Sequence, residues 1–142
     1  MVHCLLQQAC IVWSKQGILV VDDDKFLALM VAELLETKGY RVWTACDGLE
    51  GCSIYYQHQE IQTVLTDIDM PELDGFRMMH CIRDINPSAK VIYMSGAPER
   101  YRRALVAEAR NFGASTLRKP FEDTELLTLV SVLQDKARAR AA

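Results

Sequence analysis

From residue 17 onward, short apolar runs rich in β-branched residues alternate with longer segments of helical periodicity. The runs are continuously apolar, as in Ile-Leu-Val-Val at 18–21, which is typical of strands buried on both faces of a parallel sheet. The pattern predicts strands at 18–21, 41–45, 63–66, 90–94 and 115–117. A helical pattern follows each strand: the first ends at Gly39, the second runs from Asp47 to about 58, the third from Asp74-Gly75 to 86, the fourth over 98–113 and the last over about 122–138.

Five strand-then-helix units in succession imply an α/β fold with a parallel sheet, right-handed crossovers and helices on both faces. In sheets of this kind, the working site lies beyond the carboxyl ends of the strands. The residues that directly follow each strand are therefore the first candidates for chemistry.

Composition narrows the class of protein without naming a function. The 142 residues are 50% apolar and 25% charged, the profile of one globular domain that needs no metal or disulfide to fold. The net charge of −3 leaves no basic surface for nucleic acid or an anionic membrane, so we expect neither as a direct partner. No apolar run approaches the roughly 20 residues that a membrane helix requires.

Five cysteines and three histidines offer no metal-ligand spacing, and no two cysteines form a CxxC pair. An odd number of cysteines without a secretory segment indicates reduced thiols, and we expect a cytoplasmic protein. These thiols are interpreted as small packing groups or idle surface groups. The cysteines are Cys4, Cys10, Cys46, Cys52 and Cys81.

Acidic, hydroxyl and ammonium side chains follow four of the five predicted strands. Asp22–Asp24 follow the first strand, Asp67 the third, Ser95 the fourth and Lys119 the fifth. Clustered carboxylates need a cation, and oxygen ligands suit Mg²⁺. A carboxylate beside Mg²⁺, with a hydroxyl and an ammonium group close by, is suited to attack a phosphoryl group. The alternative for the triple aspartate is a structural one, since Asp is a preferred residue for capping a helix N-terminus.

Taken together and in order, these segments resemble the receiver domain of two-component response regulators. The resemblance covers about residues 17–136 and implies a doubly wound, flavodoxin-like three-layer sandwich, with five parallel strands in the order 2-1-3-4-5 and five helices. The matching segments are Ile18–Asp24, Leu65–Pro71 with Asp74-Gly75, Met94–Gly96 and Leu117–Phe121.

The resemblance implies a role for each aspartate of the site. Asp67 would be the phosphoacceptor and also a ligand of Mg²⁺. Asp23 would hold the ion directly and Asp22 through water, while the backbone carbonyl of Asp69 would complete the protein's share of the ligands.

The resemblance also implies a switch. Ser95 matches the hydroxyl that turns inward to bind the phosphoryl group, and Lys119 matches the lysine that stabilises it; its bond to Pro120 is often cis in the family. Thr116 stands where the family often has Tyr or Phe, so the usual aromatic part of the switch is in question. The small Ala97 and the acidic Asp69 occupy positions that tune phosphate lifetime.

The function implied is a phosphorylation-dependent signalling switch with Mg²⁺ as cofactor, not a turnover enzyme. Its donor would be a histidine kinase or a histidine phosphotransfer protein, and its fourth helix, fifth strand and fifth helix would form the face for a downstream protein target. We expect a stand-alone receiver domain at 17–138, monomeric or weakly dimeric. An extension of unknown role would precede it at 1–16 and a short tail would follow at 139–142.

Three other interpretations remain. One is a receiver domain that is part of a larger hybrid kinase or transcription regulator. Another is a phosphatase of the haloacid dehalogenase type, suggested by Asp67-Ile68-Asp69, although in that family the motif follows the first strand, whereas here it follows the third. The last is a pseudo-receiver that never takes phosphate and serves as a docking module. Turnover distinguishes the phosphatase, and Mg²⁺-dependent labelling distinguishes the pseudo-receiver.

Overall fold

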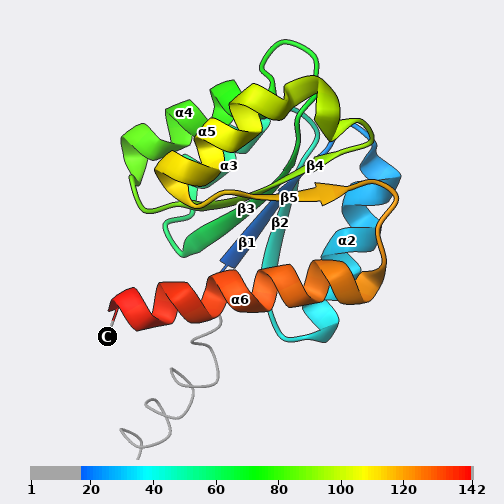
Figure 1. Cartoon of the computed structure of the whole chain (residues 1–142). Coiled ribbons are helices and arrows are strands. Elements are labelled where there is room, and N and C mark those ends of the chain that lie inside the picture. Colours follow the sequence, from blue (N-terminus) through cyan, green and yellow to red (C-terminus); the bar gives the residue numbers. More distant parts are fainter. Residues whose placement is uncertain (1–16, 142) are drawn as a thin grey trace, which may run out of the picture.

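The structure is a computed structural model that describes the backbone of residues 17–141 and the side chains of residues 17–135. The predicted extension at 1–16 therefore lies outside the described residues. Strands and helices alternate along the described chain (Figure 1). Their bounds are β1 Gly17–Val21, α2 Lys25–Thr37, β2 Arg41–Ala45, α3 Gly48–Gln57, β3 Ile61–Asp67, α4 Gly75–Ile85, β4 Lys90–Ser95, the 3₁₀ helix η1 Pro98–Tyr101, α5 Arg102–Phe112, β5 Ser115–Arg118 and α6 Asp123–Ala141.

The five strands form one parallel sheet in the order β2-β1-β3-β4-β5. Helices α3, α4 and α5 cover one face of this sheet, and α2 and α6 cover the other (Figure 1). The predicted fold class is therefore confirmed: a doubly wound, three-layer α/β sandwich. Among the described residues, no helix has both the length and the apolar content to cross a membrane.

Successive residues of β1 point to opposite faces of the sheet and separate two hydrophobic cores. Leu19 and Val21 pack under α3 and α4, whereas Ile18 and Val20 pack against α2 and α6. All four side chains are 0% exposed, which explains the continuous apolar run in the sequence. The methionines predicted to fill the core are also confirmed there: Met70 is 8% exposed, and Met78, Met79 and Met94 are 0% exposed.

Aspartates cap the three helices that follow the first three strands. Asp24 Oδ1 accepts hydrogen bonds from the amides of Phe26 and Leu27 at the start of α2. Asp47 accepts one from the amide of Glu50 in α3, and Asp74 accepts one from the third residue of α4. These bonds satisfy amides that have no partner within the helix. Each cap sets where its helix begins, and hence how long the loop at the carboxyl edge of the sheet is.

Several elements differ from the sequence prediction. Strands β4 and β5 each end one residue later than predicted, and α6 runs to Ala141, so residues 139–141 of the predicted tail belong to the helix. The helix expected over 98–113 is divided into η1 and α5, because the Arg100 amide bonds the Ala97 carbonyl three residues back and tightens the first turn. Strand β3 begins at Ile61, earlier than predicted, because Ile61 pairs with Gly17 while Gln62 is skipped in a bulge of the pairing. Both ends of β3 are longer than predicted, so Asp67 belongs to the strand itself.

A buried ion pair ties α5 to α4 and β4. The guanidinium of Arg83 donates two hydrogen bonds to Glu108, at 2.7 and 3.1 Å, and the two side chains are only 9% and 15% exposed. Tyr93 from β4 donates a further hydrogen bond to the same carboxylate, and Phe112 lies under the guanidinium at 3.6 Å. Burial and the carboxylate raise the pKa of Tyr93, so its hydroxyl stays a donor. The network joins the C-terminal half of α5 to α4 and to β4.

We expect Glu108→Ala to lower the free energy of unfolding by roughly 3 kcal/mol, because the Arg83 charge would remain buried without its partner. Urea unfolding followed by circular dichroism measures the change. The matched control is Glu99→Ala, which removes the exposed ion pair between Glu99 and Arg118 and should leave stability nearly unchanged. Equal losses in the two variants would contradict the assignment.

Candidate active site at the carboxyl edge of the sheet

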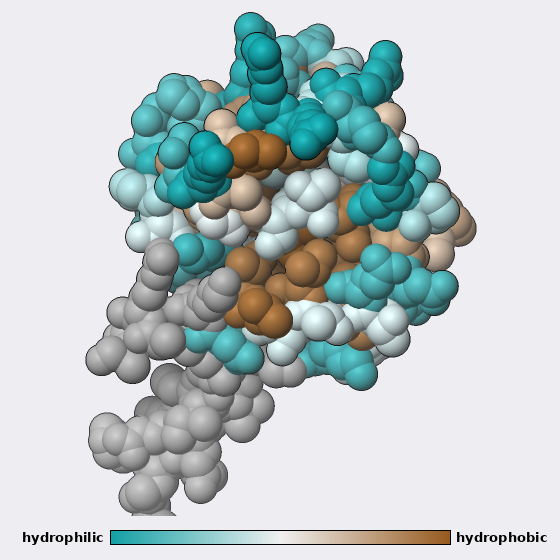
Figure 2. Space-filling view, viewed as in Figure 1, coloured by the Kyte–Doolittle hydropathy of each residue, from teal (hydrophilic) through white to brown (hydrophobic). Residues whose placement is uncertain are grey.

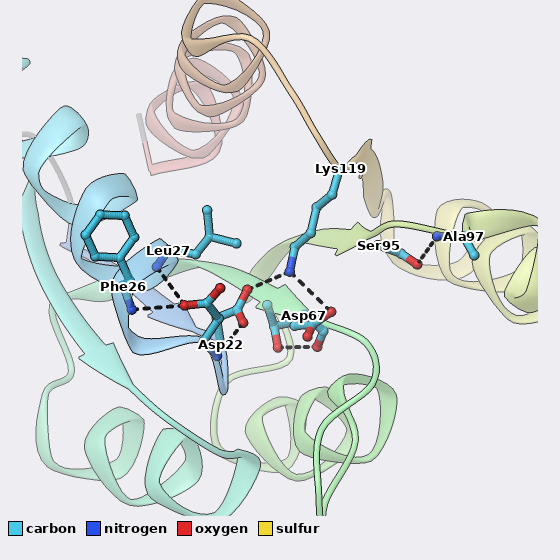
Figure 3. A network of polar contacts seen from close by, with 9 residues as sticks. Asp22, Phe26, Leu27, Asp67, Ser95, Ala97 and Lys119 are labelled. Atoms are coloured by element: carbon cyan, nitrogen blue, oxygen red, sulfur yellow. Dashed lines mark hydrogen bonds and ion pairs between the residues drawn. The ribbon is translucent and has the colours of Figure 1, made fainter.

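Residues from the ends of β1, β3 and β5 converge at one edge of the sheet (Figure 3). Asp22 and Asp23 follow β1, Asp67 is the last residue of β3, and Lys119 follows β5. Asp22, Asp23 and Asp67 each offer an oxygen within 4.8 Å of the others. The structure thus brings together the carboxylates and the ammonium group that the strand ends predicted.

The carboxylate of Asp22 is the most deeply buried group of the site. Its side chain is only 1% exposed, and its Oδ2 accepts a hydrogen bond from Lys119 Nζ at 2.7 Å. Its Oδ1 accepts a bond from the Asp24 amide at 2.9 Å, which orients the carboxylate toward the sheet edge. The three aspartates therefore have different roles. Asp24 caps α2, as the helix-capping alternative predicted, and Asp22 forms an ion pair with Lys119.

Lys119 is held between two carboxylates. Its Nζ lies 3.6 Å from Asp67 Oδ1 as well as beside Asp22, and Figure 3 shows the side chain reaching from the end of β5 into the space between them. The Lys119 amide donates to the Ser95 carbonyl at 2.8 Å, which extends the pairing of β4 with β5 by one residue. The Lys119–Pro120 peptide bond is cis, as the family resemblance implies.

The carboxyl group of Asp67 is harder to ionise than an ordinary aspartate. Burial raises its pKa from 3.8 to about 6; the positive charge of Lys119 opposes this rise, and the negative charges of Asp22 and Asp23 add to it. Three carboxylates share one ammonium group here, so negative charge is in excess. A cation entering the site would relieve that excess and favour the ionised, nucleophilic form of Asp67.

Mg²⁺ fits the donor set of this edge. The three aspartates supply hard oxygen ligands from the end of β3 and from the residues that follow β1. Asp23 is exposed to solvent, which leaves room for the water ligands that Mg²⁺ retains. Asp69, predicted to offer its backbone carbonyl, lies in the exposed loop just after β3. Its carboxylate lies near the Tyr101 hydroxyl and raises the pKa of Tyr101.

The predicted switch residues lie apart from the aspartates. Ser95 ends β4, and its Oγ accepts a hydrogen bond from the Ala97 amide at 3.0 Å, within its own loop (Figure 3). Thr116 lies in the middle of β5 with an exposed side chain. The structure therefore shows a Ser95 hydroxyl that is engaged locally and is not bonded to Asp67.

The sequence predicted a turn and a helix start at Asp74-Gly75, but it did not predict the contact of Gly75 with the end of β3. The Gly75 amide donates to the Ile68 carbonyl at 2.9 Å, and a Cβ placed there would lie 2.5 Å from the carbonyl oxygen of Asp67. Only glycine permits α4 to begin so close to the end of β3. The glycine after the capping Asp74 was the available signal in the sequence, but the need for glycine there comes from a tertiary contact with Asp67.

Comparisons with known proteins agree with this geometry. The family model described as the response regulator receiver domain matches residues 18–131. The chemotaxis protein CheY of Treponema pallidum is 33% identical over 122 residues, which cover 82% of this chain and 82% of that protein. The sensor kinase CckA of Brucella abortus is 33% identical over 121 residues, 84% of this chain, and the aligned part is only 12% of that protein.

A solved structure shows the same arrangement of elements. The response regulator receiver domain protein from Clostridium thermocellum matches with a TM-score of 0.78 at 28% identity, covering 87% of this chain and 98% of that one. The chain thus matches most of the length of a chemotaxis protein and a small part of a much longer sensor kinase.

We expect Asp67→Asn to stabilise the metal-free protein at neutral pH by on the order of 2 kcal/mol. The folded-state pKa of about 6 exceeds the ordinary 3.8, so the unfolded chain releases its proton first and ionisation favours unfolding. The stabilisation should shrink as the pH falls through this window and vanish below it. Urea unfolding in the presence of a chelator, over a pH series, measures the difference.

The control for that series is Asp84→Asn, which changes an exposed carboxylate on α4. Its difference from the native chain should not vary with pH in the same way. A pH-independent difference for Asp67→Asn would show that burial of Asp67 does not control the charge of the site.

We expect Gly75→Ala to lower the free energy of unfolding by roughly 1–3 kcal/mol, because its Cβ would press on the Asp67 backbone and force α4 or β3 to move. Gly96→Ala is the matched control, since a Cβ at Gly96 would meet nothing within 4 Å. Thermal unfolding of both variants tests the contact. A harmless Gly75→Ala would mean that α4 is free to shift.

Proposed function

The chain belongs to the response regulator receiver domain family of two-component signalling, and from this membership we propose that it is a phosphorylation switch with Asp67 as its acceptor. Receiver domains of this family act as phosphoacceptors that bind Mg²⁺ in an acidic pocket. The observation that carries the proposal for this chain is the placement of Lys119 between Asp22 and Asp67 beside a third carboxylate. Under this proposal the acceptor Asp67, the ammonium group of Lys119 and the carboxylates that would bind Mg²⁺ all lie at one edge of the sheet.

The proposed reaction is a single phosphoryl transfer. An Asp67 carboxylate oxygen forms a bond to phosphorus, and the bond from phosphorus to the donor's histidine nitrogen, or to the oxygen of an acyl phosphate, breaks. Asp22, Asp23, Asp67 and the Asp69 carbonyl would hold Mg²⁺, which when bound neutralises charge on the phosphoryl oxygens. Lys119 places its ammonium group beside Asp67 and would stabilise the same oxygens.

Ser95 would transmit the change. Its hydroxyl would leave the Ala97 amide, to which it is bonded at 3.0 Å, and would donate to the phosphoryl group on Asp67. That movement would pull the loop between β4 and η1 toward the acceptor and so bias the position of α5. Thr116 carries no aromatic ring to follow the loop, so α5 itself would be the moving part.

The face that reads this change would be formed by α5, β5 and α6. Figure 2 shows hydrophobic surface between the two helices, bordered by hydrophilic side chains. A shallow pocket of about 590 Å³ opens between η1, α5 and β5. Its lining residues are Pro98, Glu99, Arg102, Leu105, Val106, Ala109 and Thr116. A protein target that docks here would sense any displacement of α5.

The donor would be a histidine kinase or a histidine phosphotransfer protein in the cytoplasm. Similarity to the receiver segment of a sensor kinase supports such a donor. The acceptor would be labelled once and would lose its phosphate slowly, which distinguishes a switch from a phosphatase that turns over. A monomer or a weak dimer is consistent with this mode of action.

We expect the native chain incubated with acetyl phosphate and Mg²⁺ to gain one phosphoryl group in intact mass, because Asp67 is the one acceptor at the charged edge. The gain should be absent without Mg²⁺ and absent in Asp67→Asn. Asp69→Asn, which removes an exposed carboxylate two residues away, is the matched control and should still be labelled.

Labelling of Asp67→Asn would move the acceptor to another residue. Release of many equivalents of inorganic phosphate per chain would favour the phosphatase interpretation. An unlabelled native chain would favour the docking module that never takes phosphate.

A further inference from the structure

Two cysteines on neighbouring helices face each other on the side of the sheet that α3 and α4 cover. Cys52 lies in α3 and Cys81 in α4. The two helices pack so closely that a Cβ added at Gly51 would meet the Met78 sulfur at 2.6 Å. The Cys52 Sγ lies 3.9 Å from the Met78 carbonyl oxygen, and Cys81 follows Met78 by one helical turn on the same side of α4. Cys52 therefore points at the part of α4 that carries Cys81.

The two thiols are neighbours across the packed helices, and their exposure differs. Cys81 is exposed to solvent, whereas Cys52 is partly buried. Burial, and then the neighbouring Cys81, raises the pKa of Cys52 to about 11. Cys81 is thus the thiol that a dissolved oxidant meets first, and Cys52 is the shielded partner beside it.

We propose that Cys52 and Cys81 form a peroxide-sensitive dithiol site that closes a disulfide bond between α3 and α4. Hydrogen peroxide transfers one oxygen to the Cys81 sulfur, giving a sulfenic acid and one molecule of water. The Cys52 sulfur then attacks the Cys81 sulfur, the sulfur–oxygen bond breaks, and hydroxide leaves with the Cys52 proton as a second molecule of water. Both thiols are oxidised together by two electrons, and the peroxide is reduced.

The disulfide bond would restrain α4, which packs against the end of β3, although neither cysteine belongs to the proposed phosphoryl-transfer site. Cys81 lies about 9 Å along α4 from Gly75, whose backbone touches the acceptor strand at Asp67. A bond to α3 would restrain the helix that supports that strand. Cys52 and Cys81 lie inside α3 and α4, whereas the charged residues of the site stand at the strand ends, so the proposal is independent of the phosphoacceptor role.

Peptide mapping after mild hydrogen peroxide treatment tests the proposal on the full chain. No Lys or Arg lies between Arg41 and Arg77, so trypsin releases Cys46 and Cys52 on one peptide, 42–77, and Cys81 on another, 78–83. The experiment therefore uses the Cys46→Ser variant beside the native chain. Free thiols are blocked with N-ethylmaleimide under denaturing conditions before digestion.

We expect peptides 42–77 and 78–83 to be joined in a chain that stays monomeric on a non-reducing gel, with the link lost on treatment with dithiothreitol. Cys46→Ser should form the same link, since the Cys46 thiol bonds Glu50 and not a cysteine. Cys81→Ser should lose the link completely. Cys52→Ser should instead accumulate a Cys81 sulfenic acid that dimedone traps.

Two results would overturn the proposal. In one, Cys81 proceeds to sulfinic or sulfonic acid while Cys52 is still blocked by N-ethylmaleimide in the native chain. In the other, Cys81 links to a cysteine other than Cys52, within the chain or in a second copy.

Discussion

The carboxyl edge of the sheet depends on one ion-pair arrangement, in which the ammonium group of Lys119 lies among three aspartate carboxylates. Asp22 is 1% exposed and is tolerated there because Lys119, 97 positions later in the chain, donates to it at 2.7 Å. The same ammonium group lies 3.6 Å from Asp67 and limits the rise of its pKa. Because negative charge is in excess, the edge is suited to a further cation, and a bound cation would in turn attract an anionic group. The same ammonium group thus permits the burial of Asp22 and limits the pKa of Asp67.

The charged side chains are held in place by the two central strands of the sheet, which are packed between two hydrophobic cores. Asp22 directly follows the central strand β1, and Asp67 is the last residue of β3. Both strands are packed on two faces by separate cores. Gly75 lets α4 begin against the backbone of Asp67, while the pair of Arg83 and Glu108 joins α5 to α4. Asp67 is therefore held by close packing, with α4 against its backbone and α5 joined to α4.

Much of the site could be predicted because parallel strands present their carboxyl ends at a common edge. Asp22, Asp67 and Lys119 were placed together on that argument, and the structure brings them together. Asp24 shows the limit of the argument, since one run of three aspartates serves both a helix cap and an ion pair, and local sequence does not assign the roles. Cys52 and Cys81 show it again, because no spacing motif connects them and only the packing of α3 on α4 does.

The sequence by itself determined the alternation of strands and helices, the caps that begin the helices, and the residue types at the strand ends, because these follow from local periodicity and backbone chemistry. Tertiary structure alone decided which charges are buried, since burial depends on segments far apart in the chain. It raised the pKa of Asp67 to about 6, required glycine at position 75, and paired Arg83 with Glu108. Those properties arise from desolvation and close packing, which exist only once the layers have assembled.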